Sequence, residues 1–430
     1  MTEDFAAWKS WKLHRTLKII FMNQSNKLTF TILSISLLTV MAGAAIAPAL
    51  GVIHEHFAGH SSVLIQLIIS MPALFIIITN FFFAPLCKLF KTRTLAMLGL
   101  VMYLVFGAGA FFARSLGVVL IMRALLGVSV GMIMPLSTGL LAYYFPPEQQ
   151  AKLMGLSAFM NQMGGVIATL LSGLLSNISW NCSFLVYLLG IFAVALVALF
   201  LPNERLVTGE ETLKNSPDYY ESETGITKAR KKPGRPAASL LRFAPSVVGM
   251  YLQMLLFFIF PTNFAITARA NAALTGNDIT LIMVGLDVVA AIIGLAFGWM
   301  MGHMSRYMKY LAPLTFILGY GCYSLGVSTP LLLAGSALVG LANGIGMPYL
   351  NTIASIKGGR NAATTVMPLI SAALYLGQFT SPLIISPLAG LLGSPTSPYV
   401  IGMAFGIVYL IQAFCSRRYQ ALSPADGLKK

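Results

Sequence analysis

The stretch SALVGLANGIGMP, residues 336–348, repeats a pattern that the chain already carries in RALLGVSVGMIMP, residues 123–135. The two copies differ at their first residue, which is Arg123 in one and Ser336 in the other. A constant shift of 213 residues relates Gly127 to Gly340, Gly131 to Gly344, Pro135 to Pro348, Gly164 to Gly377 and Arg93 to Arg306. Landmarks at one constant offset indicate that a single unit has been duplicated within the chain.

The composition indicates that this chain is dissolved in lipid. Of its 430 residues, 57% are hydrophobic and only 10% are charged, and its mean hydropathy is +0.80. A soluble protein carries about a quarter charged residues. So few charges cannot shield this much apolar surface from water, which predicts an integral multi-pass membrane protein. The four cysteines show no spacing typical of a metal site or a disulfide framework.

Twelve apolar stretches are each close to or above the ~20 residues that a helix needs to cross a bilayer. They are residues 28–53, 62–87, 95–113, 117–143, 153–177, 181–201, 243–268, 279–302, 309–327, 330–352, 363–391 and 396–415. The sequence therefore predicts an all-α membrane protein with twelve transmembrane helices in two pseudo-symmetric six-helix bundles. The expected organisation is a cytoplasmic segment at 1–27, a bundle at 28–202, a linker at 203–242, a bundle at 243–416 and a tail at 417–430.

The net charge of +15 is explained by membrane topology and does not indicate a nucleic-acid partner. With a cytoplasmic N-terminus, the basic residues gather at cytoplasmic ends, in 9–27, 88–93, 152, 205–242, 306–309, 357–360 and 417–430. Only Arg114 and Arg269 fall at outer ends. This positive-inside asymmetry predicts that both termini are cytoplasmic. The expected location is the inner (plasma) membrane of a bacterium, with residues 5–27 along the inner membrane surface.

Three motifs resemble those of the major facilitator superfamily, and most closely its drug/proton antiporter branch. They are RALLG with Gly131 in the fourth span, FPPEQQAKLMGL at 145–156, and LPNER after the sixth span. The resemblance implies a transporter in which the first, fourth, seventh and tenth spans line a central cavity. It also implies gating roles for Arg93 and Arg306, although the segments FAPLCKLFKTR and GWMMGHMSR lack the acid that usually precedes this arginine.

Two ionisable residues lie within spans and are the candidates for ion coupling. Asp287 is the only carboxylate well inside a predicted span. Intramembrane charges are costly and usually mark ion, proton or substrate paths. Arg123 lies nine residues from Arg114 and Asp287 ten from Asn277, which places both roughly 14–15 Å below the outer surface at about 1.5 Å per residue. We expect Asp287 to accept a proton and Arg123 to be its electrostatic partner or coupling switch. The alternatives are a packing role for Asp287 and a structural clasp to helix carbonyls for Arg123.

The substrate-binding candidates follow from the cavity that the resemblance implies. They are Met41, Gln253, Phe257, Asn263 and Asn343, with Asn161 and Gln162 as residues that could instead reach Asp287 from the fifth span. The aromatic, methionine-rich seventh span favours a small amphipathic organic compound over a bare ion. The glycines Gly127, Gly131, Gly340 and Gly344 are expected to allow close helix packing, and Pro135 and Pro348 to permit gating bends.

The remaining features exclude several classes of function. The outer loop HEHFAGH holds Glu55 with His54, His56 and His60, which could bind zinc or sense the external pH. Nothing else in the chain supports a metal site, and a solvated loop is the favoured interpretation. The chain has no phosphate-binding loop, nucleophile elbow or zinc-protease motif, so no enzyme and no cofactor is expected.

The sequence therefore predicts a monomeric secondary transporter that exports a compound by proton antiport. One alternative is uptake or exchange of an organic anion, with Arg123 binding its charge. The other is a membrane sensor that does not transport.

Overall fold

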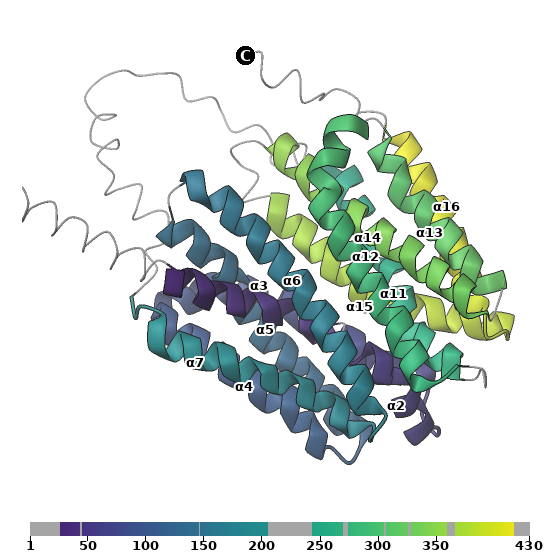
Figure 1. Cartoon of the computed structure of the whole chain (residues 1–430), viewed down its shortest axis with the longest axis horizontal. Helices are drawn as coiled ribbons and strands as arrows, with labels where there is room; N and C mark the ends of the chain where they lie inside the picture. The colour runs from purple at the N-terminus through teal and green to yellow at the C-terminus, as the bar shows by residue number, and fades with distance from the viewer. Residues whose placement is uncertain are drawn as a thin grey trace, which may run out of the picture.

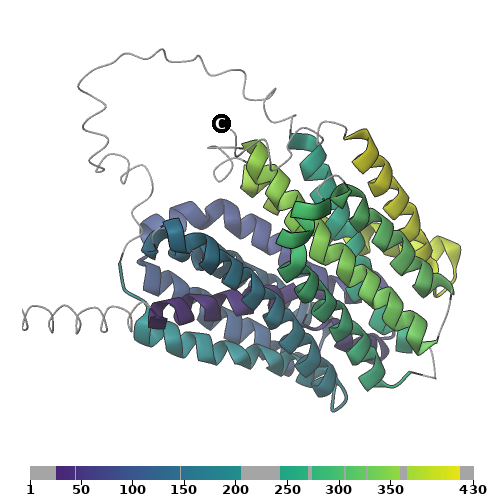
Figure 2. The same ribbon diagram turned by 45° about the horizontal axis from the view of Figure 1, so that its top comes forward.

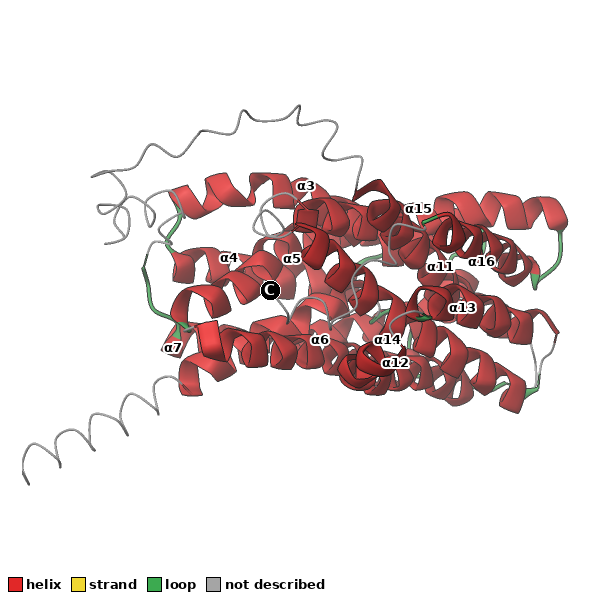
Figure 3. Ribbon diagram, turned by 90° about the horizontal axis from the view of Figure 1, so that it is seen from above, coloured by secondary structure: helices red, strands yellow, loops and turns green. Residues whose placement is uncertain are grey.

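The computed structural model describes residues 26–43, 45–145, 147–204, 243–269, 274–304, 307–325, 328–358 and 366–416. Within these ranges all regular structure is helical (Figure 3). Arg306 and almost all of the predicted N-terminal segment, linker and tail lie outside the described residues.

The described helices form two halves that lie side by side, purple to teal and green to yellow in Figures 1 and 2. The first half contains residues 26–43, η1 (Ala47–Ala49), α2 (Leu50–His56), α3 (Ser62–Leu89), α4 (Thr92–Ala108), η2 (Gly109–Phe112), α5 (Leu116–Tyr144), α6 (Pro147–Ser176), η3 (Asn181–Leu189) and α7 (Gly190–Phe200). The second half contains α11 (Ala244–Arg269), α12 (Gly276–Met304), α13 (Met308–Leu325), α14 (Thr329–Gly358), α15 (Met367–Leu392) and α16 (Ser397–Cys415). The main contacts between the halves join α3 to α15 and α6 to α12.

The predicted spans correspond to these helices. Eleven helical segments of the described chain are long and apolar enough to cross a membrane. The twelfth predicted span, 309–327, corresponds to α13, which has 18 residues and packs against α14 and α16. Two bundles of six membrane helices, as predicted, therefore make up the fold.

The first predicted span, 28–53, is not one continuous helix. Its helix covers residues 26–43, and the chain then turns before η1 and α2. Pro48 lies in η1, where it cannot donate a backbone hydrogen bond and its ring crowds the preceding turn. The break interrupts the regular pattern of intrahelical hydrogen bonds after residue 43, although the N–H of Ala45 still donates to the carbonyl of Met41 at 3.2 Å.

The duplication seen in the sequence recurs in the helix contacts. Gly127 of α5 lies directly against the backbone of Pro72 in α3, and Gly340 of α14 lies against the backbone of Leu286 in α12. One turn further on, Gly131 lies against the Thr79 side chain and Gly344 against the backbone of Ala290. Equivalent glycines therefore let equivalent helices approach closely in both halves. Pro135 and Pro348 lie inside α5 and α14 respectively.

The closest approach at a glycine in the first half is at Gly164 of α6, where a Cβ would overlap the carbonyl oxygen of Leu37. Gly377 of α15 has the same relation to Tyr251 of α11. We expect Gly164→Ala to lower the unfolding free energy by about 3 kcal/mol, because a backbone oxygen cannot move aside as a side chain can.

Thermal unfolding in detergent measures this difference. Gly155→Ala is the matched control on the same helix, since a Cβ there would meet nothing within 4 Å. Equal melting temperatures for the two variants would contradict the expected overlap.

Candidate functional site

The side chain of Arg123 is fully buried, with 0% exposed, and binds backbone groups of neighbouring helices. Its Nε donates to the carbonyl oxygen of Ile68 at 2.5 Å. Its two terminal nitrogens donate to the hydroxyl of Tyr187 and to the carbonyl oxygen of Ala42. The guanidinium carbon also lies 5.6 Å from the centre of the Tyr187 ring. One side chain thus ties residues 26–43, α3 and η3 to α5.

Both carbonyls that Arg123 binds lie where the regular pattern of intrahelical hydrogen bonds is interrupted. The carbonyl of Ile68 would normally accept from residue 72, which is proline and has no N–H. The carbonyl of Ala42 lies at the break after residue 43. An unsatisfied backbone carbonyl costs several kcal/mol in a membrane. Arg123 therefore supplies donors that the backbone has lost.

The second half meets the same positions with smaller donors. The Ser336 hydroxyl donates to the carbonyl of Ile282 in α12, and the Tyr320 hydroxyl donates to the carbonyl of Leu256 in α11. These two acceptors stand 214 residues after Ile68 and Ala42. Because α12 contains no proline, its backbone keeps its own donors and a serine hydroxyl suffices. This difference accounts for the arginine in one copy of the motif and the serine in the other.

Asp287 lies on α12 at the contact with α6, where the two halves meet. It is half-buried, and the Thr169 hydroxyl of α6 donates to its Oδ2 at 2.8 Å. Along the same contact Gly173 packs against Thr280. The contact ends where the Asn177 amide donates to Oδ1 of Asn277 at 2.7 Å. A change in the charge of Asp287 would therefore act directly on an interface between the halves.

A cavity of about 20 Å³ adjoins Asp287 and has room for a single water molecule. Its remaining lining residues are Ala47, Thr169, Phe257, Phe260, Pro261, Met283 and Leu286. Pro261 lies inside α11 and has no N–H, so the carbonyl of Phe257 lacks its usual intrahelical donor. The carboxylate thus borders a small chamber in which Thr169 is the other residue with a polar side chain.

The structure differs from two expectations about these residues. Arg123 and Asp287 are not paired, because Arg123 binds within the first half and Asp287 binds Thr169. Asn161 accepts a hydrogen bond from Thr39 at 2.9 Å and does not contact Asp287. The position of a residue along its helix gives its expected depth, but it does not determine which way the side chain faces.

The predicted outer end of the bundle, around residues 55–66, is closed by polar contacts between the halves. The Gln66 amide of α3 donates to Oδ1 of Asn263 in α11 at 2.9 Å. The Ser386 hydroxyl of α15 donates to the amide oxygen of Gln66. Glu55 of α2 and Arg269 of α11 form an ion pair at 3.8 Å. Gln66 therefore contacts both α11 and α15, and its amide is the centre of this closure.

We expect Gln66→Leu to shift the protein toward opening of this end, because leucine removes both amide contacts. Two hydrogen bonds of about 1 kcal/mol each correspond to roughly a 30-fold change in the ratio of closed to open states. A single cysteine in place of the fully buried Ser70, in a background without native cysteines, reports the opening. Its modification by a membrane-impermeant maleimide is expected to become at least about tenfold faster.

Gln412→Leu is the matched control, since that amide donates to the carbonyl of Pro245 within the second half, at 2.7 Å. Labelling as fast in the control as in Gln66→Leu would mean that the closure does not depend on Gln66.

A larger cavity of about 390 Å³ lies toward the predicted cytoplasmic end, between α3, α5 and α15. It is lined by Ile77, Asn80, Phe81, Phe83, Met134, Pro135, Thr138, Met367, Pro368, Ser371 and Ala372. With closure at the other end, this arrangement corresponds to a state open toward the predicted cytoplasmic side. Of the residues singled out in the sequence, only Pro135 lines this cavity. No sequence signal marks the others, because their common position depends on how α3 and α15 separate.

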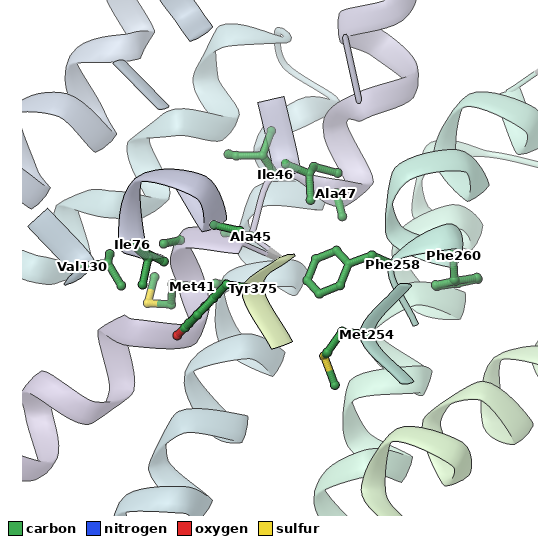
Figure 4. Packing of buried hydrophobic residues seen from close by; sticks show 14 of the residues in the cluster. Met41, Ala45, Ile46, Ala47, Ile76, Val130, Met254, Phe258, Phe260 and Tyr375 are labelled. Atoms are coloured by element: carbon green, nitrogen blue, oxygen red, sulfur yellow. The ribbon is translucent and has the colours of Figure 1, made fainter. Parts of the chain in front are cut away.

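The predicted substrate residues do not lie together. Met41 is fully buried, and Tyr375 of α15 extends toward it (Figure 4). The Gln253 amide donates to the carbonyl of Ala342 at 3.2 Å. The amide oxygens of Gln253 and Asn343 are buried without a partner.

The other predicted substrate residues are elsewhere in the bundle. Phe257 borders the Asp287 cavity, Asn263 belongs to the outer closure, and Gln162 is half-buried on α6. The structure thus brings none of the seven into the larger cavity.

Two further predicted sites have structural contacts. Arg93 donates to the carbonyl of Ala198 in the last turn of α7, which satisfies a helix-terminal acceptor. In the outer loop, His56 stacks on Trp180 with ring centres 4.8 Å apart, and His54 lies 3.3 Å from the Ser62 hydroxyl. In the part of the chain that the structure describes, no three His, Cys, Asp or Glu side chains gather as metal ligands would.

Comparison with known proteins places these features in a family context. The profile of the Major Facilitator Superfamily matches residues 32–382. Over 313 residues the chain is 23% identical to the quinolone resistance protein NorA of Staphylococcus aureus (strain MRSA252), with 68% of this chain and 75% of NorA covered. An uncharacterized transporter of Schizosaccharomyces pombe is 28% identical over 185 residues, which span 42% of this chain and only 37% of that protein.

Solved structures share the fold at low sequence identity. A bacterial homolog of the human lysosomal transporter Spinster, in an inward-facing and occupied conformation, matches with a TM-score of 0.72 at 14% identity, covering 93% of this chain and 99% of that one. The nucleoside transporter NupG matches with a TM-score of 0.67 at 12% identity, covering 92% of this chain and 100% of its own.

Proposed function

Because the chain belongs to the Major Facilitator Superfamily, we propose that it exports a small amphipathic organic compound in exchange for protons. The family consists of secondary transporters and not of enzymes, so the energy comes from an ion or solute gradient. Two halves that rock about a central site expose that site to each side in turn. Membership of the family leaves open the coupling ion, the direction of transport and the class of compound, for which we propose the proton, export and a small amphipathic organic compound.

The observation that carries the proposal is the position of Asp287. It is the only carboxylate in the middle of a described span, it faces a chamber with room for one water, and it lies on the α6–α12 contact between the halves. The ionised carboxylate of Asp287 is energetically unfavourable in this poorly solvated position, and protonation removes that unfavourable free energy. Movement of one half against the other changes the solvation of Asp287, which links its protonation to the transport cycle.

The role of Arg123 in this mechanism is to hold the first half together. Its donors bind two backbone carbonyls and one hydroxyl. Arg123 therefore holds these helices of the first half against one another while the halves move. A fully buried guanidinium, each of whose three nitrogens binds a group of the first half, gives no support to the alternative in which Arg123 binds an organic anion. Export as the direction rests on the similarity to NorA, whose name refers to quinolone resistance.

Purified protein in liposomes with a trapped pH-sensitive dye tests the proposal. We expect some members of a panel of cationic and neutral amphipathic compounds to provoke proton movement on addition. Anionic compounds of similar size form the comparison group. Proton movement provoked only by anions would favour anion exchange, and silence across the panel from folded protein would contradict proton coupling.

A further inference from the structure

We propose that the cavity between α3, α5 and α15 is a side entrance, through which a compound passes directly from the lipid of the predicted cytoplasmic leaflet into the transporter. This inference rests on the proposed export of an amphipathic compound and specifies its route and its chemistry. The compound that fits the cavity has an apolar group about the size of an aromatic ring and one hydrogen-bond donor.

The walls of the cavity suit such a body. The volume of about 390 Å³ lies within the range of small-molecule sites. Phe81, Phe83 and Met134 supply aromatic and thioether surface, and no lining residue is charged. Transfer of an apolar group from lipid into this cavity would therefore cost little free energy, because both surroundings are mainly apolar.

The cavity extends to the surface that faces lipid. Phe81 lines it and is 75% exposed, and the adjacent Phe82 is 60% exposed. Both belong to a segment apolar enough to cross the membrane, Ser62–Phe83. On the opposite wall Pro368 of α15 is exposed as well. Exposed aromatic rings within a span contact lipid, so the opening between α3 and α15 faces the bilayer.

One polar group in the wall of the cavity has no partner, and it belongs to Asn80, which lines the cavity. The amide oxygen of Asn80 is shut off from solvent and accepts no hydrogen bond. A buried acceptor left unpaired costs about 1–3 kcal/mol. Rotation of the Asn80 side chain toward an N–H or O–H group of an entering compound would remove that cost. The Thr138 side chain is exposed at the same cavity and provides a second polar contact.

The separation of α3 from α15 is confined to this end. Toward the other end the two helices are joined by the contact between Gln66 and Ser386. One turn beyond Ser371, the Tyr375 hydroxyl of α15 contacts the sulfur of Met134 at 2.6 Å. A compound entering between the helices would therefore stop at Tyr375, which extends toward Met41 (Figure 4).

Photolabelling of the full chain in lipid nanodiscs tests the entrance without relying on transport. The probe is a phenyl diazirine that carries a phenol hydroxyl, and labelled peptides are mapped by mass spectrometry. We expect labelling at residues 77–83 and 367–372 to fall at least about tenfold in Ser371→Trp, whose indole fills the cavity. Leu376→Trp is the matched control on the same helix, since Leu376 is exposed, and it should label as the wild type does.

The hydrogen bond to Asn80 is tested with the methyl ether of the same probe, which has no donor. Loss of one hydrogen bond corresponds to about a three- to tenfold loss of affinity. We therefore expect the phenol to compete several-fold better than the ether in the wild type and equally well in Asn80→Leu. Equal competition in the wild type would mean that any apolar chain, including a lipid acyl chain, fills the cavity, and would overturn the assignment.

The outcomes separate this inference from the proposed function. Labelling of the cavity in protein that moves no protons would leave the entrance in place and contradict antiport. Compound-driven proton movement that is unchanged in Ser371→Trp, or absence of labelling in the wild type, would overturn the entrance and leave antiport in place.

Discussion

Liposomes that hold Asp287→Asn are expected to exchange a compound across the membrane at close to the wild-type rate, while transport driven by a pH gradient falls to the level of empty liposomes. Asparagine keeps the size of the side chain and can still accept a hydrogen bond from Thr169, but it cannot gain or lose a proton at pH 7. Exchange requires only that the halves alternate with compound bound. Net transport against a gradient requires that the proton be returned, which the variant cannot do.

The measurement compares counterflow of a labelled compound with its gradient-driven transport in the same preparation. Asp278→Asn is the matched control on α12, because that carboxylate lies at the exposed start of the helix and accepts hydrogen bonds from Thr275. Both transport modes should survive in the control. Full gradient-driven transport by Asp287→Asn would show that another group carries the proton.

Replacement of Arg123 by alanine is expected to lower the unfolding free energy by about 3 kcal/mol or more. The change leaves two backbone carbonyls and the Tyr187 hydroxyl without the donor that they have in the wild type. Each stranded buried acceptor costs about 1–3 kcal/mol. Arg123→Lys should recover only part of the loss, because one ammonium group cannot reach three acceptors in the planar geometry of a guanidinium.

Thermal unfolding in detergent measures this loss of stability, with Arg114→Ala as the control. Arg114 precedes α5 and is exposed, so its removal should leave the melting temperature unchanged. If Arg123→Ala kept its stability and lost only the transport of anionic compounds, Arg123 would be a substrate contact and the clasp would be secondary.

The fold was largely accessible from the sequence for a physical reason. A segment that crosses lipid must satisfy its own backbone, so each span is a local run of apolar residues that can be recognised without its neighbours. The glycine pairs were recognisable because close helix contacts at equivalent places demand the same small residue in both copies. Pro48 and Pro72 also mark places where a helix loses a backbone donor. The sequence does not show which side chain supplies the missing donors.

The details of the site depend on partners that lie far apart in the chain. Thr169 and Asp287 are separated by 118 residues, and Arg123 reaches Ile68 over 55 residues. The rise of a helix gives the depth of each charge from its sequence position, but the direction in which the side chain points depends on how the helix is rotated against its neighbours. For that reason the sequence identified both charged residues as candidates, and only the tertiary structure showed that each has its own partners.

Composition, span length, the duplication and the choice of Asp287 and Arg123 as unusual residues were properties of local sequence. The closure at Gln66, the chamber beside Asp287 and the cavity at Asn80 arise from the relative placement of the two halves. Each of these features is built from side chains of at least two helices, and in the closure and both cavities the helices come from different halves. No periodicity within one helix carries that information, because it is set by the energy of packing one bundle against the other.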